Sequence, residues 1–550
     1  MKGWGSPDGY LLSNFQLIVL SSFLQIPLYN FAFFRNFFAT YPPSILNIVH
    51  FLSVVILMVS TLMMLLTLVL TKYTARFFLI IILLASSVSA YFMDTYNVII
   101  DTDMIKNILL TDVAESSDLL NLRLAGYLLA LGILPATLIF KLNISYGTVI
   151  QELLGKVKLL FLSLLLMVVA IAPLSDFYAT FFREHKILRY YINPLTYIYS
   201  LGKYLTENFD SRSDDVSPLG KDAKVSEMDG RRELVILIVG ETARANRFSL
   251  NGYERKTNPL LEKENVYSFK HFSSCGTSTI VSVPCMFSIY GRKEFTNKKA
   301  KHTENLLDAL AHAGVHILWR DNNSSSKGVA DRVIYENFKS RDNNPACDVE
   351  CRDEGMLFGL QDYIDKHADG DIFIVLHQMG NHGPAYYKRY PESFEKFKPV
   401  CKTNELDQCS KKEIGNAYDN AILYTDYFLS KVISLLKKNS NKFETVMVYM
   451  SDHGESLGEN GLYLHGLPYF AAPKTQTLIP AIFWFGKSYG GLDPKALTSK
   501  LNVPYSHDNL FHTIIGIMEL NTSIYNYKMD ILWRPDRLPL PSLISPKTSG

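Results

Sequence analysis

Four apolar, β-branched runs that lie after residue 232 each lead into polar residues that can do acid–base or metal chemistry. ELVILIVG leads to Glu241, VHILW to residues 320–323, DIFIVLHQMG to His382, and TVMVYM to Asp452 and His453. Short apolar runs that alternate with helical patterns predict a parallel sheet covered on both faces. Ligands bind beyond the carboxyl ends of such strands. The runs therefore predict one active site at one edge of a sheet.

Glu241, Asp452 and His453 form a candidate metal-ligand set. Two carboxylates and an imidazole suit Zn²⁺ or another first-row metal better than Ca²⁺ or Mg²⁺. Taken alone, SDHGE is explained equally well as a charged turn between a strand and a helix. The second strand-end carboxylate, Glu241, favours the metal site.

The segment SCGTSTIVSVPCMFS supplies the candidate nucleophile. Thr277, Ser278 or Thr279 could lie at a helix N-terminus, where free N–H groups and the helix dipole attract phosphate. A hydroxyl bound to a metal loses its proton near neutral pH and becomes a nucleophile. An ordinary Ser/Thr N-cap would leave the same pattern. A disulfide between the flanking Cys275 and Cys285 would fix the loop for in-line displacement, which favours the catalytic interpretation.

Three further side chains lie in Gly- or Pro-containing loops. His382 in NHGP and His465 in LHGLP could hold a second metal or protonate a leaving oxygen. Lys327, in DNNSSSKG, is a candidate phosphate clamp, although a lone Lys in a polar loop is usually solvated. His377, at a strand end, is interpreted as structural.

The elements that must position these residues divide the chain into two parts. The chain has 550 residues, 48% of them hydrophobic, with 55 Lys and Arg against 53 Asp and Glu. Disorder is therefore excluded as the main state, and a net charge of +2 gives no basic face for nucleic acid. Residues 1–175 hold only nine Lys and Arg and eight Asp and Glu, and all six cysteines follow them.

Five uncharged apolar runs in the first part predict five transmembrane helices. A spanning helix needs about 20 mostly apolar residues, with roughly 17 as the lower limit. Five runs in succession argue against buried core helices, and the first lacks the small-residue cleavage site of a signal peptide. The runs are residues 9–34, 36–71, 77–93, 124–140 and 159–175.

The loops between these runs predict the orientation. Lys72 and Arg76 make the second loop basic, three lysines between residues 141 and 158 do the same for the fourth, and the third is acidic. Basic loops stay in the cytoplasm. We therefore expect a cytoplasmic N-terminus and an exported C-terminal domain.

The cysteines agree with export, because an even count without zinc-finger spacing indicates disulfides in an oxidising compartment. Six cysteines allow about 15 pairings. Short loops favour three local pairs, each stabilising the fold by about 2 to 3 kcal/mol. These pairs are Cys275–Cys285, Cys347–Cys351 and Cys401–Cys409.

The expected organisation has four parts. Residues 1–175 form the five-span membrane domain and 233–530 the catalytic domain. Between them, residues 176–232 combine an aromatic and charged stretch suited to interfacial helices with a polar linker. The Pro- and Ser-rich tail, 531–550, is predicted to be disordered.

Four segments together resemble one enzyme family: GETARANRFSLNGYERKTNP, SCGTSTIVSVPCMFS, NHGPAYYKRYP and SDHGESLGENGLYLHGLP. They are similar to the bacterial phosphoethanolamine transferases that modify lipid A, including the mobile colistin-resistance enzymes. That family belongs to the alkaline phosphatase and sulfatase-like superfamily. The resemblance covers residues 10–530 and implies an α/β fold class, with a five-helix membrane bundle and a sulfatase-like doubly wound sheet domain.

The resemblance also implies roles for individual residues. Thr279 matches the family's nucleophile and, with Glu241, Asp452 and His453, its Zn²⁺ site. The other matching positions are His382 and His465, for a second zinc or the phosphoryl group, and Asn323, Ser324 and Lys327, for the substrate loop.

In the third loop of the membrane part, Asn107, Thr111 and Glu115 match a proposed ethanolamine-recognition patch, and an acidic loop suits a cationic headgroup. One departure concerns Lys327. Many relatives enclose this lysine in a disulfide, where this chain has Ser326 and Ala330. We therefore expect a less constrained substrate loop.

The implied reaction has two steps. Thr279 attacks the phosphate of phosphatidylethanolamine and expels diacylglycerol, and a phosphate of lipid A then takes the phosphoethanolamine. The resemblance places the chain in the bacterial inner membrane with a periplasmic catalytic domain. A monomer is expected, although the sequence leaves the oligomeric state open. Lower negative charge at the cell surface should weaken binding of cationic peptides such as polymyxin.

Rival functions remain at this stage. The same chemistry could serve a core sugar or another glycan. A glycerol-phosphate transferase of the lipoteichoic acid synthase type is disfavoured by the cysteine pairs and GTST, and a plain sulfatase by the lack of a C/S-x-P-x-R context. A non-catalytic membrane sensor is disfavoured because Glu241, Thr279, Asp452 and His453 are all present.

Overall fold

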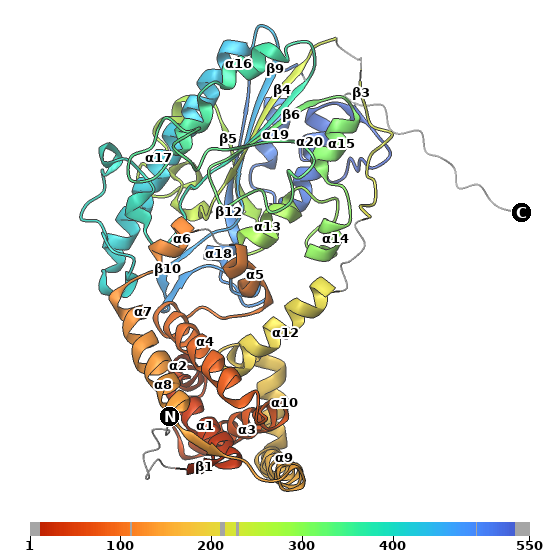
Figure 1. Ribbon diagram of the computed structural model, residues 1–550. Helices are drawn as coiled ribbons and strands as arrows, with labels where there is room; N and C mark the ends of the chain where they lie inside the picture. The colour runs from red at the N-terminus through yellow and green to blue at the C-terminus, as the bar shows by residue number, and fades with distance from the viewer. Residues whose placement is uncertain (1–10, 111–112, 210–214, 227–229, 491, 534–550) are drawn as a thin grey trace, which may run out of the picture. The chain divides into compact units, whose positions relative to one another are not determined.

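The apolar runs of the first part form helices. The computed structural model describes residues 11–110, 113–209, 215–226, 230–490 and 492–533 (Figure 1). Its chain divides into two units, each described here by itself. One contains Met1–Ile108 and Leu120–Thr206, and the other contains Leu109–Leu119 and Glu207–Gly550.

Four helices of the first unit are long and apolar enough to cross a membrane. A fifth candidate is the bent pair α1 (Asn14–Leu28) and α2 (Phe31–Thr40), whose axes differ by 57°. The described residues therefore contain four spans, or five if the bent pair counts as one. The first two are α3 (Ile45–Val69) and α4 (Ala75–Tyr96). The third, Leu122–Lys141, joins α7 (Leu122–Tyr127), η1 (Leu128–Ile133) and α8 (Leu134–Lys141). The fourth, Val149–Glu184, includes α9 (Val149–Ile171) and α10 (Ser175–Glu184).

The bend departs from the single straight helix expected for residues 9–34. Pro27 lies in the last turn of α1, where it cannot donate a backbone hydrogen bond. The side chain of the buried Asn30 then donates to the carbonyls of Ile26 and Asn193, at 2.9 and 2.7 Å. Arg35 consequently lies inside α2 rather than between two spans.

The surface of this unit is apolar where a membrane would cover it. On α9, the side chains of Leu153, Val157 and Phe161 are more than half exposed. Water-facing surfaces rarely carry contiguous apolar patches of this kind, whereas lipid tails favour them. The remaining elements are β1 (Leu11–Ser13), paired with β2 (Asn143–Ser145), α5 (Thr102–Leu110), α11 (Lys186–Arg189) and α12 (Leu195–Phe209).

The second unit is built on an eight-stranded sheet with the order β13-β5-β12-β9-β4-β8-β6-β7. Its central strand β4 (Glu233–Gly240) pairs in parallel with β8 (Ile372–His377) and β9 (Glu444–Ser451). β6 (His316–Asp321) pairs in parallel with β8. The four apolar runs singled out from the sequence are thus neighbours in the sheet, and their carboxyl ends meet at one edge.

The sheet is mixed rather than fully parallel. β12 (Leu478–Phe485) runs antiparallel to β9 and to β5 (Tyr267–Ser273). Between β9 and β12 the chain makes only a small hairpin and the four-residue helix α18 (Lys474–Thr477), so no long helix returns it to the far edge. The outer strands are β7 (Ile334–Asn337) and β13 (Tyr505–Ser506).

Helices cover both faces of this sheet, as expected for a doubly wound fold. Even-numbered side chains of β4 from Leu234 to Ile238 pack with α16 (Leu360–Lys366) and α17 (Lys411–Asn439). Odd-numbered ones from Val235 to Val239 pack on the opposite side, where Figure 1 shows the remaining helices. Burial of both faces explains why β4 is a continuous apolar run. The helices of that side are α13 (Thr279–Met286), α15 (Leu306–His312), α19 (Pro494–Lys500) and α20 (Leu510–Ile517).

Three disulfides close loops of the second unit: Cys275–Cys285, Cys347–Cys351 and Cys401–Cys409. These are the pairs expected from the sequence. The predicted tail falls almost entirely on residues 534–550, which lie outside the described residues. The smaller elements are α6 (Val113–Asp118), α14 (Asn297–Lys301), the pair β3 (Lys224–Val225) and β14 (Leu520–Asn521), and the hairpin β10 (Ser456–Glu459) and β11 (Leu462–Leu464).

Candidate active site

Glu241, Asp452 and His453 come together immediately beyond two adjacent strands. β4 pairs Gly240 with Ser451 at the end of β9, so the next residue of each strand enters the same space. The three side chains are essentially fully buried, and their ligand atoms lie within 4.8 Å of one another. His453 Nε2 is 3.6 Å from a Glu241 oxygen and 3.4 Å from Asp452 Oδ2.

The donor set fits a metal ion. Asp452 Oδ1 accepts the N–H groups of Thr242 and His453, but the buried Oδ2 has no hydrogen-bond partner among the described residues. His453 Nδ1 donates to the Gly454 carbonyl at 2.9 Å, which leaves the lone pair of Nε2 directed at the cluster. Burial lowers the pKa of His453 to about 4, so its imidazole is neutral. Buried carboxylates this close together require a positive partner.

Thr279 faces this cluster from the start of α13. Its Oγ1 lies 3.2 Å from Glu241 Oε2 and 3.5 Å from His453 Nε2. The neighbouring Thr277 hydroxyl instead donates to the Leu467 carbonyl, and Ser278 is the N-cap of the helix. Of the hydroxyls that the residue pattern left open, Thr279 is the one directed at the candidate metal ligands.

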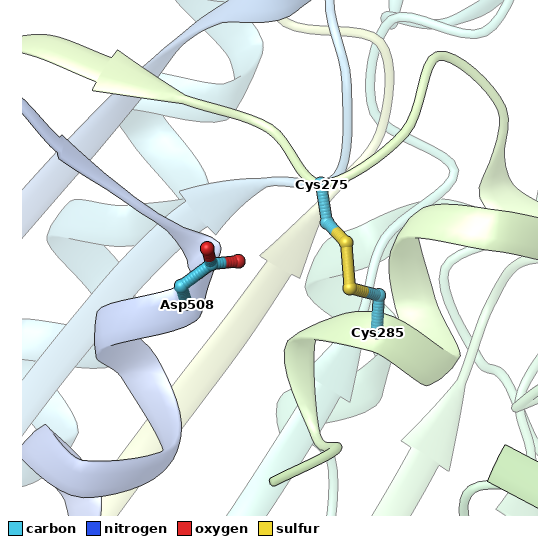
Figure 2. A group of neighbouring side chains, drawn as sticks. All are labelled: Cys275, Cys285 and Asp508. Carbon is cyan, nitrogen blue, oxygen red and sulfur yellow. A yellow bond between two sulfur atoms is a disulfide. The ribbon is translucent and has the colours of Figure 1, made fainter. Parts of the chain in front are cut away.

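A disulfide and a buried histidine hold the loop that carries Thr279. Figure 2 shows the Cys275–Cys285 bond joining the loop before α13 to the helix itself. Asp508 lies beside it and accepts the Arg292 N–H at 2.9 Å. Because both sulfur atoms are joined to each other, this group is a structural crosslink rather than a metal site.

His507 was missed by the sequence analysis. Its Nδ1 accepts the Cys275 N–H and its Nε2 donates to the Ser451 carbonyl, both at 3.0 Å. Burial lowers the pKa of His507 to about 4, which keeps this bridge neutral. It links the Thr279 loop to the strand that delivers Asp452, and a lone His in a loop gave no signal of this role.

The two loop histidines lie beside the cluster. The rings of His453 and His465 are 4.3 Å apart between centroids, and those of His382 and His465 are 5.7 Å apart. Desolvation lowers the pKa of His382 well below its ordinary value. His465 Nδ1 is 3.3 Å from the fully buried Glu455. Glu455 is the last residue of SDHGE and was overlooked as a functional residue.

The loop after β6 contributes an amide to the cluster. Asn323 Nδ2 donates to Glu241 Oε2 and to the Gln378 carbonyl, each at 2.8 Å. Asn323 therefore fixes the orientation of Glu241, a candidate metal ligand. This contact is additional to the substrate contact that the family resemblance implies for Asn323.

Lys327 is folded onto its own loop. Its Nζ donates to the carbonyl and hydroxyl oxygens of Ser324, at 2.8 and 2.7 Å. Ser326 Oγ accepts the Ala330 N–H at 3.1 Å, and both residues are buried. A hydrogen bond thus closes the loop where many relatives are expected to have a disulfide.

The expected headgroup residues remain a prediction. Asn107 is half-buried on α5, in the first unit. Thr111 and the side chain of Glu115 lie outside the described residues.

Comparison with known proteins agrees with this geometry. Residues 233–520 match the Sulfatase family, and residues 58–209 match the family described as phosphoethanolamine transferase EptA/EptB. The chain is 42% identical to phosphatidylethanolamine transferase Mcr-1 of Escherichia coli, with 92% of this chain and 95% of the relative covered. It is 39% identical to phosphoethanolamine transferase EptA of Salmonella typhimurium, with 95% and 97% covered.

The fold has a close match among solved structures. The lipooligosaccharide phosphoethanolamine transferase A (EptA) of Neisseria meningitidis, an integral membrane protein, superposes with a TM-score of 0.91 at 34% identity. The match covers 95% of this chain and 98% of the other. The chain therefore belongs to the phosphoethanolamine transferase family, whose catalytic part has a sulfatase-like fold.

Proposed function

We propose that this protein transfers phosphoethanolamine from phosphatidylethanolamine to a phosphate of lipid A, with Thr279 as the nucleophile. The observation that supports this most strongly is a hydroxyl directed at a buried set of metal ligands, 3.2 Å from Glu241. The relatives' names support the transferred group, because two of the similar enzymes are named phosphatidylethanolamine transferase and phosphoethanolamine transferase.

Glu241, Asp452 and His453, with Thr279, would hold Zn²⁺. When bound, zinc lowers the pKa of a hydroxyl and offsets negative charge on a phosphoryl group. The protein's own contribution is orientation. Asn323 fixes the Glu241 carboxylate, and the Gly454 carbonyl fixes the His453 tautomer.

In the first step, Thr279 Oγ1 forms a bond to phosphorus and the bond from phosphorus to the glycerol oxygen breaks. The threonine proton leaves toward Glu241, its nearest acceptor, and diacylglycerol departs with a proton. We assign delivery of that proton to His465, because its ring lies beside His453 and Glu455 can stabilise its charged form. Phosphoethanolamine is then esterified to Thr279.

In the second step, an oxygen of a lipid A phosphate attacks the same phosphorus and the bond to Thr279 breaks. Glu241 returns its proton to the Thr279 oxygen, and the proton of the incoming phosphate passes to His465, so all three residues regain their starting protonation states. His382, neutral and next to His465, would contact the phosphoryl group in both steps.

The membrane arrangement follows from the loop charges. We propose a cytoplasmic N-terminus, a periplasmic catalytic domain and a monomeric enzyme. Each transfer caps a phosphate with an amine, which lowers the net negative charge of the cell surface and weakens binding of polymyxin.

Mass spectrometry of lipid A tests the proposal. Cells that express the wild-type chain should gain the mass of phosphoethanolamine on lipid A, and cells that express Thr279→Ala should not. Modified core sugars with unmodified lipid A would reassign the acceptor. Equal modification by the variant would exclude Thr279 as the nucleophile.

A further inference from the structure

The C-terminal end of α6 (Val113–Asp118) is tied to other parts of the second unit by one buried carboxylate. Asp118 ends α6, and its side chain is 7% exposed. Its Oδ1 accepts from Lys388 Nζ at 2.5 Å, and its Oδ2 accepts from Arg389 Nη2 at 2.8 Å. Asn404 Nδ2 also donates to the Asp118 carbonyl at 2.6 Å. Three contacts therefore hold this short helix at a defined place.

Arg389 connects Asp118 to the candidate active site. Its side chain is only 2% exposed. Its Nη1 pairs with Glu350, and its Nε donates to the His382 carbonyl at 2.6 Å. One guanidinium thus fixes Asp118, Glu350 and the backbone of His382, whose ring lies 5.7 Å from that of His465. Only Arg presents donors in a rigid fork that can serve three acceptors in this way.

The charges of this cluster are mutually stabilised. Burial opposes ionisation of Asp118, but Arg389 and Lys388 outweigh it and hold the pKa of Asp118 below its ordinary value. The two carboxylates likewise raise the pKa of Arg389. Because a buried pair loses most when one partner is removed, neutralising Asp118 should loosen both the end of α6 and Arg389.

We propose that Asp118 is a positioning residue for the transfer reaction, which acts through Arg389 to hold the His382 loop and the C-terminal end of α6 together. This inference rests on the proposed function. Thr111 and Glu115, the residues expected to recognise the donor headgroup, belong with Asp118 to the segment Leu109–Leu119 in sequence. Asp118 would thereby couple donor binding to the loop that contacts the phosphoryl group.

The test uses the zinc-loaded, full-length protein in detergent and a fluorescent phosphatidylethanolamine, with diacylglycerol release as the readout. Asp118→Asn should raise the KM for the donor about tenfold and lower kcat as well. Asp118→Glu should recover part of the loss. The matched control is Asp365→Asn, which removes an exposed carboxylate paired with Lys442 at 3.1 Å and should leave both constants within twofold.

A second variant separates the contact of Arg389 with Asp118 from its contact with Glu350. Glu350→Gln removes the other carboxylate from Arg389 and leaves Asp118 in place, so kcat should fall while the donor KM stays near that of the wild type. If Asp118→Asn leaves KM and kcat within twofold of the wild type, or only lowers the melting temperature, the proposal is wrong.

Hydrogen exchange distinguishes this failure from failure of the proposed function. A wild-type protein that releases no diacylglycerol would contradict the proposed function. In that case, the exchange rate of the peptide that contains residue 118 is compared between the Asp118→Asn and Asp365→Asn variants. Faster exchange in Asp118→Asn would still support the positioning role of Asp118, and equal exchange would overturn it.

Discussion

Two groups of side chains meet at the edge of the sheet where β4 and β9 end, and they are held in different ways. The strand-end group, Glu241, Asp452 and His453, directly follows β4 and β9, so the sheet's own backbone ladder sets its spacing. The loop group, His382, His465 and Lys327, lies beyond the strands in loops. Polar contacts from other residues fix the loop group. The sheet thus sets the candidate metal site, while side chains distant in sequence adjust the groups proposed to contact substrate.

The largest expected effect comes from Thr279, the residue that the strand-end group is placed to activate. Thr279→Ala should lower the rate of diacylglycerol release by at least roughly 10⁴-fold, because the Thr279 hydroxyl lies 3.2 Å from Glu241 Oε2 whereas the neighbouring Thr277 hydroxyl donates to the Leu467 carbonyl. Thr279→Ser should retain a large part of the rate. If Thr279→Ala keeps more than a few per cent of the wild-type rate, the two-step reaction through this residue is wrong.

The next effect concerns the metal itself. Asp452→Asn removes a charge from a buried site whose Oδ2 has no partner among the described residues. Bound metal, measured by elemental mass spectrometry, should fall, and transfer should drop roughly 10³-fold, beyond the 10- to 100-fold cost typical of residues behind metal ligands. Full metal content in Asp452→Asn would remove this residue from the ligand set. A chelator should reduce the wild-type protein to the same level, with recovery on adding Zn²⁺.

The loop group should behave differently in both measurements. His465→Asn should lower kcat by roughly 10²-fold, at the lower end of general acid–base catalysis, and leave the metal content unchanged. A parallel loss of metal would instead make His465 a ligand and would erase the distinction between the two groups. Glu455→Gln, which leaves His465 without its carboxylate partner 3.3 Å away, should reproduce part of the kcat effect.

The same distinction explains what the sequence could predict. Polar residues immediately after apolar strands have little freedom, so Glu241, Asp452 and His453 could be placed at one site without coordinates. A run such as LIPAIFWF does not indicate the direction of its strand, so the antiparallel pairing of β12 with β9 could not be predicted from the sequence. The contacts of Arg389 join residues far apart in the sequence, including Asp118, and no local pattern predicts them.

The smallest effect is expected for Lys327, where the structure sharpens the sequence-based role of a phosphate clamp. Its ammonium group is directed at Ser324, and two hydrogen bonds to that residue occupy two of its three N–H donors, which limits what it can offer to a substrate phosphate. Lys327→Ala should therefore lower kcat/KM by no more than about tenfold, since exposed ion pairs contribute only about 1 kcal/mol. Ser324→Ala removes one of these two hydrogen bonds, keeps the one to the backbone carbonyl, and should weaken transfer less than Lys327→Ala does. A loss of 10²-fold or more in Lys327→Ala would show that the loop closes on the substrate, and Lys327 would then rank with the histidines of the loop group.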